Sequence, residues 1–170
     1  ISTLGVFLFD LDNFKHYNDR NGHPAGDDLL RSLSEVMREV TREGEVLGRY
    51  GGEEFLLVMP NATKEAAMRG AERLRAAIAS KTFRFGEGQP LGRISISGGV
   101  AAFPEDGRHA GELTTAADHA LYEAKRQGRN RVVAYKGTEQ VMQEDGKIEH
   151  DARNEKDGFI TLEELVPDDD

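Results

Sequence analysis

The sequence predicts an α+β domain, in which helices flank a central, mostly antiparallel sheet in a split βαβ layer. Two observations predict this class. Short apolar runs typical of strands alternate with segments whose apolar residues recur every three or four positions, as in amphipathic helices. These segments follow the order β-α-α-β-β-α-β-α-β within residues 1–137, so a helix pair separates the first strand from a central hairpin.

The chain opens with a predicted strand that ends in acidic residues. Leu4–Phe9 is an uninterrupted apolar run, and Asp10-Leu11-Asp12 follows it. Such a run is typical of a buried strand, and the acidic residues mark the loop into which it opens. We expect Asn13 to cap the short helix that follows, which ends at Asn21-Gly22.

A long helix and a hairpin come next. Val46–Tyr50 and Phe55–Met59 flank Gly51-Gly52, which predicts a hairpin with a tight Gly-Gly turn. Two residues without a Cβ also let a bulky ligand lie against the backbone, although a turn that needs positive φ explains the pair equally well. The helix before the hairpin is predicted from near Pro24 to about Val40, with an apolar face formed by Leu29, Leu30, Leu33, Val36, Met37 and Val40.

The second half of the domain alternates helices and strands. Arg93–Ala101 alternates apolar and polar residues and is predicted to be a half-buried strand. Leu113–Arg126 is predicted to be a helix that Gly128 ends, and Val132–Tyr135 is predicted to be the final strand. Thr63 is expected to cap the preceding helix, whose apolar side is formed by Ala66, Ala67, Ala71, Leu74 and Ile78.

Charge divides the chain into a neutral domain and an acidic extension. The 170 residues carry a formal charge of −9, and all of it arises from residues 138–170, which hold twelve acids and three bases. We therefore expect a catalytic or binding domain over residues 1–137, with a boundary near Gly137. The acidic balance argues against nonspecific nucleic-acid binding, which depends on contacts between basic side chains and phosphates.

Composition excludes further classes of site. The sequence contains no Cys, which excludes disulfides, thiolate zinc sites and thiol nucleophiles. No apolar run approaches the roughly 18 residues of a membrane span, so we expect no membrane contact within this chain. These features predict a cytoplasmic domain, in a full-length protein that other regions could anchor to a membrane.

Asp10 and Glu53 are candidate metal ligands. Asp10 ends the first apolar run and Glu53 follows the Gly-Gly pair, so the two carboxylates converge if their strands are neighbours. Clustered carboxylates and backbone carbonyls are ligands that hard divalent cations prefer. Acids at strand ends and in hairpins are also commonly solvated, and the spacing alone leaves that interpretation open.

Basic and amide residues form two further candidate groups. Lys125 and Arg129 lie four positions apart at a helix end, where cations either bind phosphate or complement the helix dipole. Lys15, just past the first acidic segment, is another candidate phosphate ligand. Asn18 and Asp27 bracket a turn, and an amide with a carboxylate can bind the edge of guanine, but both residues can also be helix caps.

Together these segments resemble the GGDEF family of diguanylate cyclases over about Leu4–Lys136. The signature here is Gly51-Gly52-Glu53-Glu54-Phe55, an active form of the family motif. The resemblance is specific because several separate strings match in the family's order. These are Asp10-Leu11-Asp12-Asn13-Phe14-Lys15, Asn18-Asp19, Gly22-His23-Pro24-Ala25-Gly26-Asp27, Arg49-Tyr50 before the signature, Ser95-Ile96-Ser97-Gly98-Gly99-Val100, Ala117-Asp118 and Tyr122-Glu123-Ala124-Lys125-Arg126-Gln127-Gly128-Arg129-Asn130.

The resemblance implies a fold similar to nucleotidyl cyclases and to the palm of polymerases. It implies the condensation of two GTP into cyclic di-GMP with release of two pyrophosphates, at the interface of a transient homodimer. Asp10, the carbonyl of Leu11 and Glu53 would hold Mg²⁺ or Mn²⁺. Glu53 or Glu54 would take the proton of the attacking hydroxyl.

The same resemblance implies the nucleotide ligands. Asn18 and Asp27 would bind guanine, and Asp27 favours GTP over ATP. The alternative is a catalytically silent module that senses GTP or a cyclic dinucleotide and controls a partner, which the intact acidic signature argues against. The phosphate ligands would be Lys15, Lys125 and Arg129, with main-chain N–H groups of Asn13 and Phe14.

The chain departs from the family in one internal segment. Arg42-Glu43-Gly44-Glu45 stands where many members have an inhibitory product site of the form Arg-x-x-Asp. Glu45 is a carboxylate one methylene longer than the expected acid. Product inhibition through Arg42, Glu45 and Arg73 and a merely exposed charged turn are both open at this point.

Two further departures concern the ends of the sequence. Family members usually open with a Leu-Thr-Gly-Leu-x-Asn-Arg segment, and we expect this sequence to lack it because Ile1 already lies in the first strand. Asp157–Leu165 resembles the second half of an EF-hand loop. Arg153 would occupy the first ligand position, where a carboxylate is needed, which argues against calcium binding there.

Overall fold

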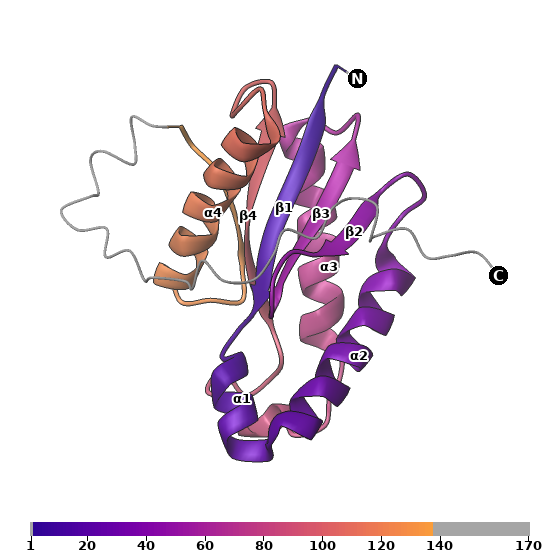
Figure 1. The fold of residues 1–170 in the computed structure, drawn as a ribbon, viewed down its shortest axis with the longest axis vertical. Coiled ribbons are helices and arrows are strands. Elements are labelled where there is room, and N and C mark those ends of the chain that lie inside the picture. Colours follow the sequence, from indigo (N-terminus) through magenta and orange to yellow (C-terminus); the bar gives the residue numbers. More distant parts are fainter. Residues whose placement is uncertain (1, 138–170) are drawn as a thin grey trace.

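The computed structural model describes residues 2–137, and in that range the predicted order of strands and helices is confirmed. The predicted acidic extension and its EF-hand-like segment lie outside the described residues. The elements, shown in Figure 1, are β1 (Leu4–Leu11), α1 (Phe14–Asn21), α2 (His23–Val40), β2 (Val46–Arg49), β3 (Glu54–Pro60), α3 (Lys64–Ser80), a short 3₁₀ turn η1 (Gly86–Gly88), β4 (Ile96–Phe103), α4 (Ala110–Arg126) and β5 (Val132–Ala134).

The strands form one five-stranded sheet in the order β2-β3-β1-β4-β5. β1 is central and antiparallel to both neighbours, and β5 is parallel to β4. Asp10 faces Glu54 of β3 on one side and Ser97 of β4 on the other. The end of β1, the tip of the β2–β3 hairpin and the start of β4 therefore meet at one edge of the sheet, as the sequence predicted for Asp10 and the hairpin.

The opposite end of the sheet carries both ends of the described domain. Leu4, at the start of β1, pairs with Pro60 of β3 and with Phe103 of β4. β5 runs in the same direction as β4, and its continuation at Tyr135 donates its main-chain N–H to the carbonyl of Val100 at 2.8 Å. The chain thus enters and leaves the sheet away from the end at which β1 leads into α1 (Figure 1).

Helices cover both faces of the central strands (Figure 1). Phe7 and Phe9 of β1 pack in a core formed with α2 and α3, whereas Val6 and Leu8 pack against α4. Each fully buried Phe or Leu side chain contributes about 1.5–3 kcal/mol through the loss of its contact with water. β1 is thereby a rigid support for the residues at its end.

β4 is buried on both faces, which corrects the prediction of a half-buried strand over Arg93–Ala101. The alternating pattern is broken by Gly98 and Gly99, and both are required by close approaches. A Cβ on Gly98 would lie 2.1 Å from Cε1 of Phe7, and a Cβ on Gly99 would lie 2.1 Å from the carbonyl oxygen of Ala117. The glycines therefore let a β1 ring and the α4 backbone approach β4 from opposite faces.

The predicted caps are partly confirmed. The side chain of Thr63 accepts the N–H of Ala66 at the start of α3, as predicted. The cap predicted at Asn13 is wrong: its side chain makes no capping hydrogen bond, and its backbone is left-handed with a φ of 56°. Asn13 instead turns the chain from β1 into α1.

None of the helices between residues 2 and 137 combines the length and the apolar character that a bilayer crossing requires.

Candidate active site

The hairpin tip lies against the end of β1 through backbone contacts. Leu11 donates its N–H to the carbonyl of Glu53 at 3.4 Å, beside the pairing of Asp10 with Glu54. The structure therefore places the predicted acidic positions Asp10, Glu53 and Glu54 at one edge. Glu53 is exposed, and Glu54 is half-buried.

The turn of this hairpin is wider than predicted. β2 ends at Arg49 and β3 begins at Glu54, whose carbonyl accepts the N–H groups of Tyr50 at 2.8 Å and Gly51 at 3.2 Å. Among the described residues, positive φ at glycine occurs elsewhere and not at Gly51 or Gly52. The interpretation of this pair as a turn that needs positive φ is therefore wrong.

Asp10 is buried with only one of its carboxylate oxygens satisfied. Its Oδ2 accepts Nζ of Lys125 at 2.5 Å. Its Oδ1 is buried and has no hydrogen-bond partner among the described residues. Burial raises the pKa of Asp10 from 3.8 to about 6, against the lowering effect of Lys125, and the charges of Asp12 and Glu54 raise it further.

A divalent cation fits this donor set only in part. No group of three His, Cys, Asp or Glu side chains in residues 2–137 forms a metal site by itself. The free Oδ1 of Asp10 and the acids of the adjacent hairpin tip nevertheless supply hard oxygen donors. The residues present therefore fit a cation that brings further oxygen ligands with it, such as phosphate oxygens.

Asn18 and Asp27 lie on the two helices that follow β1. Asn18 has the second buried, unpartnered side-chain oxygen of the described residues, its Oδ1. Gly26 of α2 leaves room for this amide, because a Cβ there would lie 1.8 Å from that oxygen. The interpretation of both residues as helix caps is wrong: α2 begins after Gly22 without a side-chain cap, and the main-chain carbonyl of Asn18 accepts the Gly22 N–H.

Asp27 opens onto a groove of about 470 Å³ between α2 and the hairpin. The groove has an aromatic wall at Phe55 and a basic side chain at Arg49, whose Nε donates to the carbonyl of Gly52 at 2.9 Å. Its remaining lining residues come from α2: Leu30, Arg31, Ser34, Glu35 and Arg38.

The predicted phosphate ligands are basic side chains near the same edge. Lys125 is in the last turn of α4 and contacts Asp10 directly. Arg129 is exposed in the loop after α4, and Lys15 is exposed in α1. The structure joins Lys125 to Asp10 and leaves Arg129 and Lys15 open to solvent.

A set of buried polar residues was missed by the sequence reasoning. The carboxylate of Asp12 accepts hydrogen bonds from the hydroxyls of Ser95 and Ser97 and from the main-chain N–H of Asn130. Nε2 of Gln89 donates to the carbonyl of Asn13 at 3.1 Å and supports the turn into α1. The signal was the spacing of Ser95 and Ser97, which places two hydroxyls on the same side of an otherwise apolar segment.

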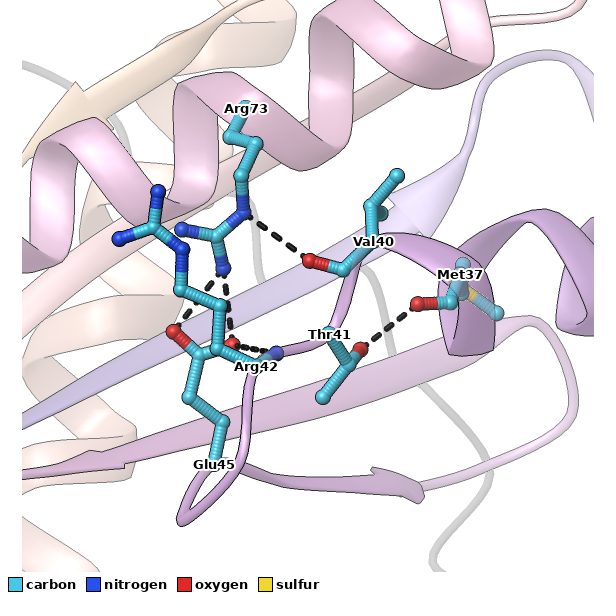
Figure 2. A network of polar contacts seen from close by, with 6 residues as sticks. All are labelled: Met37, Val40, Thr41, Arg42, Glu45 and Arg73. Atoms are coloured by element: carbon cyan, nitrogen blue, oxygen red, sulfur yellow. Dashed lines mark hydrogen bonds and ion pairs between the residues drawn. The ribbon is translucent and has the colours of Figure 1, made fainter.

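The predicted product site lies away from this edge, and Figure 2 shows its polar contacts. Nη2 of Arg73 contacts both carboxylate oxygens of Glu45, at 2.9 and 2.8 Å, and its Nε donates to the carbonyl of Val40 at 3.0 Å. Arg42 donates its main-chain N–H to Oε2 of Glu45 at 2.9 Å. The structure brings all three predicted residues together, with Glu45 already engaged by Arg73.

Comparison with family models matches residues 2–131 to "Diguanylate cyclase, GGDEF domain". Over 134 residues the chain is 39% identical to diguanylate cyclase A of Treponema denticola, and over 130 residues 44% identical to diguanylate cyclase DgcP of Pseudomonas aeruginosa. These alignments cover 79% and 76% of the chain but only 36% and 19% of the relatives. The chain therefore spans about a third of the length of one relative and about a fifth of the other.

Solved structures give the same result. The chain is similar to the active GGEEF domain of a diguanylate cyclase from Vibrio cholerae, with a TM-score of 0.71, 33% identity and coverage of 81% of this chain and 85% of that one. It is also similar to the GGDEF domain of DgcB from Caulobacter crescentus in complex with c-di-GMP, with a TM-score of 0.70, 34% identity and 79% coverage of both chains. The observed sheet and flanking helices are those of this domain type.

Proposed function

The chain belongs to the GGDEF family of diguanylate cyclases, and we propose that it condenses two GTP molecules into cyclic di-GMP with release of two pyrophosphates. The observation that carries the proposal concerns the two buried, unpartnered side-chain oxygens of the described residues. They belong to Asp10 and Asn18, which the family resemblance assigns to the metal and to guanine. Burying an acceptor without a donor is costly, so each oxygen is supported as a ligand-binding group.

Asp10, the carbonyl of Leu11 and Glu53 would hold Mg²⁺ or Mn²⁺. When bound, the cation offsets the charge of the triphosphate and aligns the attacking and leaving oxygens. The Lys125–Asp10 ion pair supports this assignment, since a cation already lies against Oδ2 while Oδ1 remains open.

The reaction requires a proton acceptor for the 3′-hydroxyl. As the new bond forms between the 3′-oxygen and the α-phosphorus, the bond from that phosphorus to the bridging oxygen breaks, and pyrophosphate leaves. We assign the proton to Glu53 or Glu54, because both lie at the hairpin tip beside Asp10.

Asn18 and Asp27 would bind guanine, whose N1–H and exocyclic amine are donors for their oxygens. This pairing predicts a preference for GTP over ATP. Lys15, Lys125 and Arg129, together with main-chain N–H groups of Asn13 and Phe14, would hold the β- and γ-phosphates. Basic groups are the expected partners of a polyphosphate.

One domain with one bound GTP presents half of the reaction. Cyclic di-GMP needs two α-phosphates and two 3′-hydroxyls, so we propose that two copies face each other in a transient homodimer. The activity per molecule is then expected to rise with protein concentration. We also propose that Arg42, Glu45 and Arg73 form a second site that takes the product, in which the product competes with Glu45 for Arg73.

The test is incubation with GTP and Mg²⁺ at several protein concentrations while pyrophosphate and cyclic di-GMP are followed. We expect turnover whose specific rate increases with concentration. Glu53→Gln is expected to abolish turnover and to leave the circular dichroism spectrum unchanged. Measurable GTP binding without pyrophosphate release by the unmodified chain would overturn the proposal in favour of a sensing module.

A further inference from the structure

Asp12 lies two residues beyond Asp10, in a buried polar network that the proposed chemistry leaves unused. Its carboxylate accepts the hydroxyl of Ser95, just before β4, at 2.7 Å and that of Ser97, in β4, at 2.6 Å. It also accepts the main-chain N–H of Asn130 at 3.0 Å. An ionised carboxylate only accepts hydrogen bonds, so these three donors fix its orientation.

Asn130 is the point at which the loop after α4 is held. Its main-chain N–H also approaches Oγ of Ser97 at 3.0 Å, and its side-chain oxygen accepts Nη1 of Arg75 of α3 at 2.8 Å. Arg129 and Asn130 have φ values of 68° and 48°, a left-handed conformation that residues with a Cβ adopt at a cost. Contacts from Asp12, from Ser97 of β4 and from Arg75 of α3 thus maintain a backbone conformation that the loop would not favour by itself.

We propose that Asp12 and Asn130 form a clasp that positions Arg129, in the loop after α4, for the β- and γ-phosphates of the nucleotide. The inference rests on the proposed function, which assigns those phosphates to Lys125 and Arg129. The clasp acts through the cations, so Asp12 and Asn130 are positioning residues.

The clasp also explains why an acid directly follows β1. Asp12 is the first residue after the strand that carries Asp10, and it contacts the loop that follows Lys125. One strand end therefore sets both the carboxylate and the cation-bearing loop that would flank a triphosphate. An Asn at position 12 has the same shape but no charge, so the hydrogen bond from the Asn130 N–H loses its charged acceptor and the clasp is weakened.

The experiment measures nucleotide affinity without turnover. The full chain is titrated with 3′-deoxy-GMP and 3′-deoxy-GTP in Mg²⁺, because neither nucleotide has the attacking hydroxyl. The readout is the dissociation constant of 3′-deoxy-GMP divided by that of 3′-deoxy-GTP. This ratio isolates the contribution of the β- and γ-phosphates to affinity. We expect Asp12→Asn to lower this ratio about tenfold, as for a hydrogen bond that loses the charge of its acceptor, with 3′-deoxy-GMP affinity within about twofold of the unmodified chain.

The matched control is Asp106→Asn. The side chain of Asp106 is 5% exposed and accepts the N–H of Ala102 and Nζ of Lys64 at the other end of the sheet. Both variants are expected to lower the melting temperature, but only Asp12→Asn should change the ratio. A merely structural role for Asp12 would instead weaken both nucleotides equally.

A second pair of variants avoids the buried core in case Asp12→Asn does not fold. Arg75→Met removes the support of the Asn130 side chain and is expected to lower the ratio about threefold, as for the loss of one ordinary hydrogen bond. Glu72→Gln removes the ion pair of Arg75 with Glu72 while leaving its contact with Asn130, and should not change the ratio.

The outcomes separate the clasp from the proposed function. An unchanged ratio in Asp12→Asn or, if that variant is unfolded, in Arg75→Met overturns the clasp alone. Equal affinities of the unmodified chain for the two nucleotides overturn the phosphate assignment and the clasp with it. An unmodified chain with the expected ratio but no turnover of GTP overturns the proposed function and leaves the clasp standing.

Discussion

Two buried aspartates at opposite ends of the sheet each form an ion pair with a lysine. They differ in whether their second carboxylate oxygen has a hydrogen-bond partner. Asp10 accepts Lys125 at 2.5 Å, and its Oδ1 has no partner among the described residues. Asp106 accepts Lys64 at 2.9 Å, and its Oδ2 accepts the N–H of Ala102 at 2.8 Å. The two acids have side chains of equal exposure, 5%.

The comparison separates a structural acid from a candidate ligand. Lys64 also donates to the carbonyl of Tyr135, so the Asp106 cluster fastens α3 and the end of β5 to the turn after β4. The Asp10 carboxylate fastens less and stays incompletely satisfied, which is the pattern of a group whose partner arrives from solution. Burial and an ion pair are common to both, so the open oxygen is the distinguishing feature.

The largest expected difference between the two acids is in turnover. Asp10→Asn should lower the rate of pyrophosphate release at saturating GTP about 1,000-fold, because it removes a proposed charged ligand of the cation. Asp106→Asn should stay within about twofold at 25 °C, where both variants remain folded. Comparable losses in the two variants would erase the functional distinction between the two ends of the sheet.

The two substitutions should change the free energy of unfolding in opposite directions. Asp106→Asn leaves Lys64 and the Ala102 N–H without their acceptor and is expected to lower the free energy of unfolding by about 1–3 kcal/mol. Asp10→Asn removes the charge of a buried carboxyl whose pKa is raised from 3.8 to about 6. This substitution should therefore raise the free energy of unfolding by up to about 3 kcal/mol at pH 7.5. Urea titration followed by circular dichroism measures both values, and a destabilised Asp10→Asn variant would contradict a net cost of burying the Asp10 charge.

The pH dependence of that stability difference sharpens the comparison. The folded pKa of Asp10 lies above its ordinary value, so the folded state binds more protons between about pH 4 and pH 6. The contribution of Asp10 is therefore favourable at low pH and is lost as the pH rises through 6. Relative to Asp10→Asn, the unmodified chain should lose about 2 kcal/mol between pH 4.5 and pH 7.5. A difference that stays flat over this range would place the carboxyl pKa near its ordinary value.

The smallest expected effect concerns a third engaged acid, Glu45. Its carboxylate is bound by Arg73, as Asp106 is by Lys64, so we expect product affinity to come mainly from the arginines. Arg42→Met should raise the half-inhibitory concentration of cyclic di-GMP about fivefold with unchanged stability, since Arg42 contacts Glu45 through its main chain. The control is Arg108→Met, in the exposed turn before α4. Equal inhibition of both variants would remove Arg42 from the proposed product site.

The element order could be predicted because each segment carries its own local signal. The apolar run of β1, the three-to-four spacing of α2 and the cap at Thr63 depend only on neighbours in sequence, and all three were confirmed. The burial of β4 could not be predicted. Gly98 and Gly99 interrupt its pattern, and their reason is the approach of Phe7 and α4 from distant parts of the chain.

The position of Asp10 beside the hairpin could also be predicted from the sequence, since antiparallel neighbouring strands bring the two together. The ion-pair partner of Asp10 could not be predicted. Lys125 lies 115 positions away, and its contact depends on how α4 crosses the sheet. The Asp12 network was missed for the same reason, because its donors come from β4 and from the loop after α4. Long-range polar contacts need the packed structure, whereas helix and strand periods do not.

The described chain enters the sheet at Leu4, which pairs with Phe103, and leaves it after Tyr135, which donates its main-chain N–H to Val100. Both points lie toward the end of the sheet that carries Asp106. A reporter protein or a surface linker joined near either of these ends would project away from the Asp10 edge. Two domains immobilised in this manner would keep the faces of the proposed homodimer accessible to each other, so the local density of tethered copies becomes an experimental means of testing how activity depends on pairing.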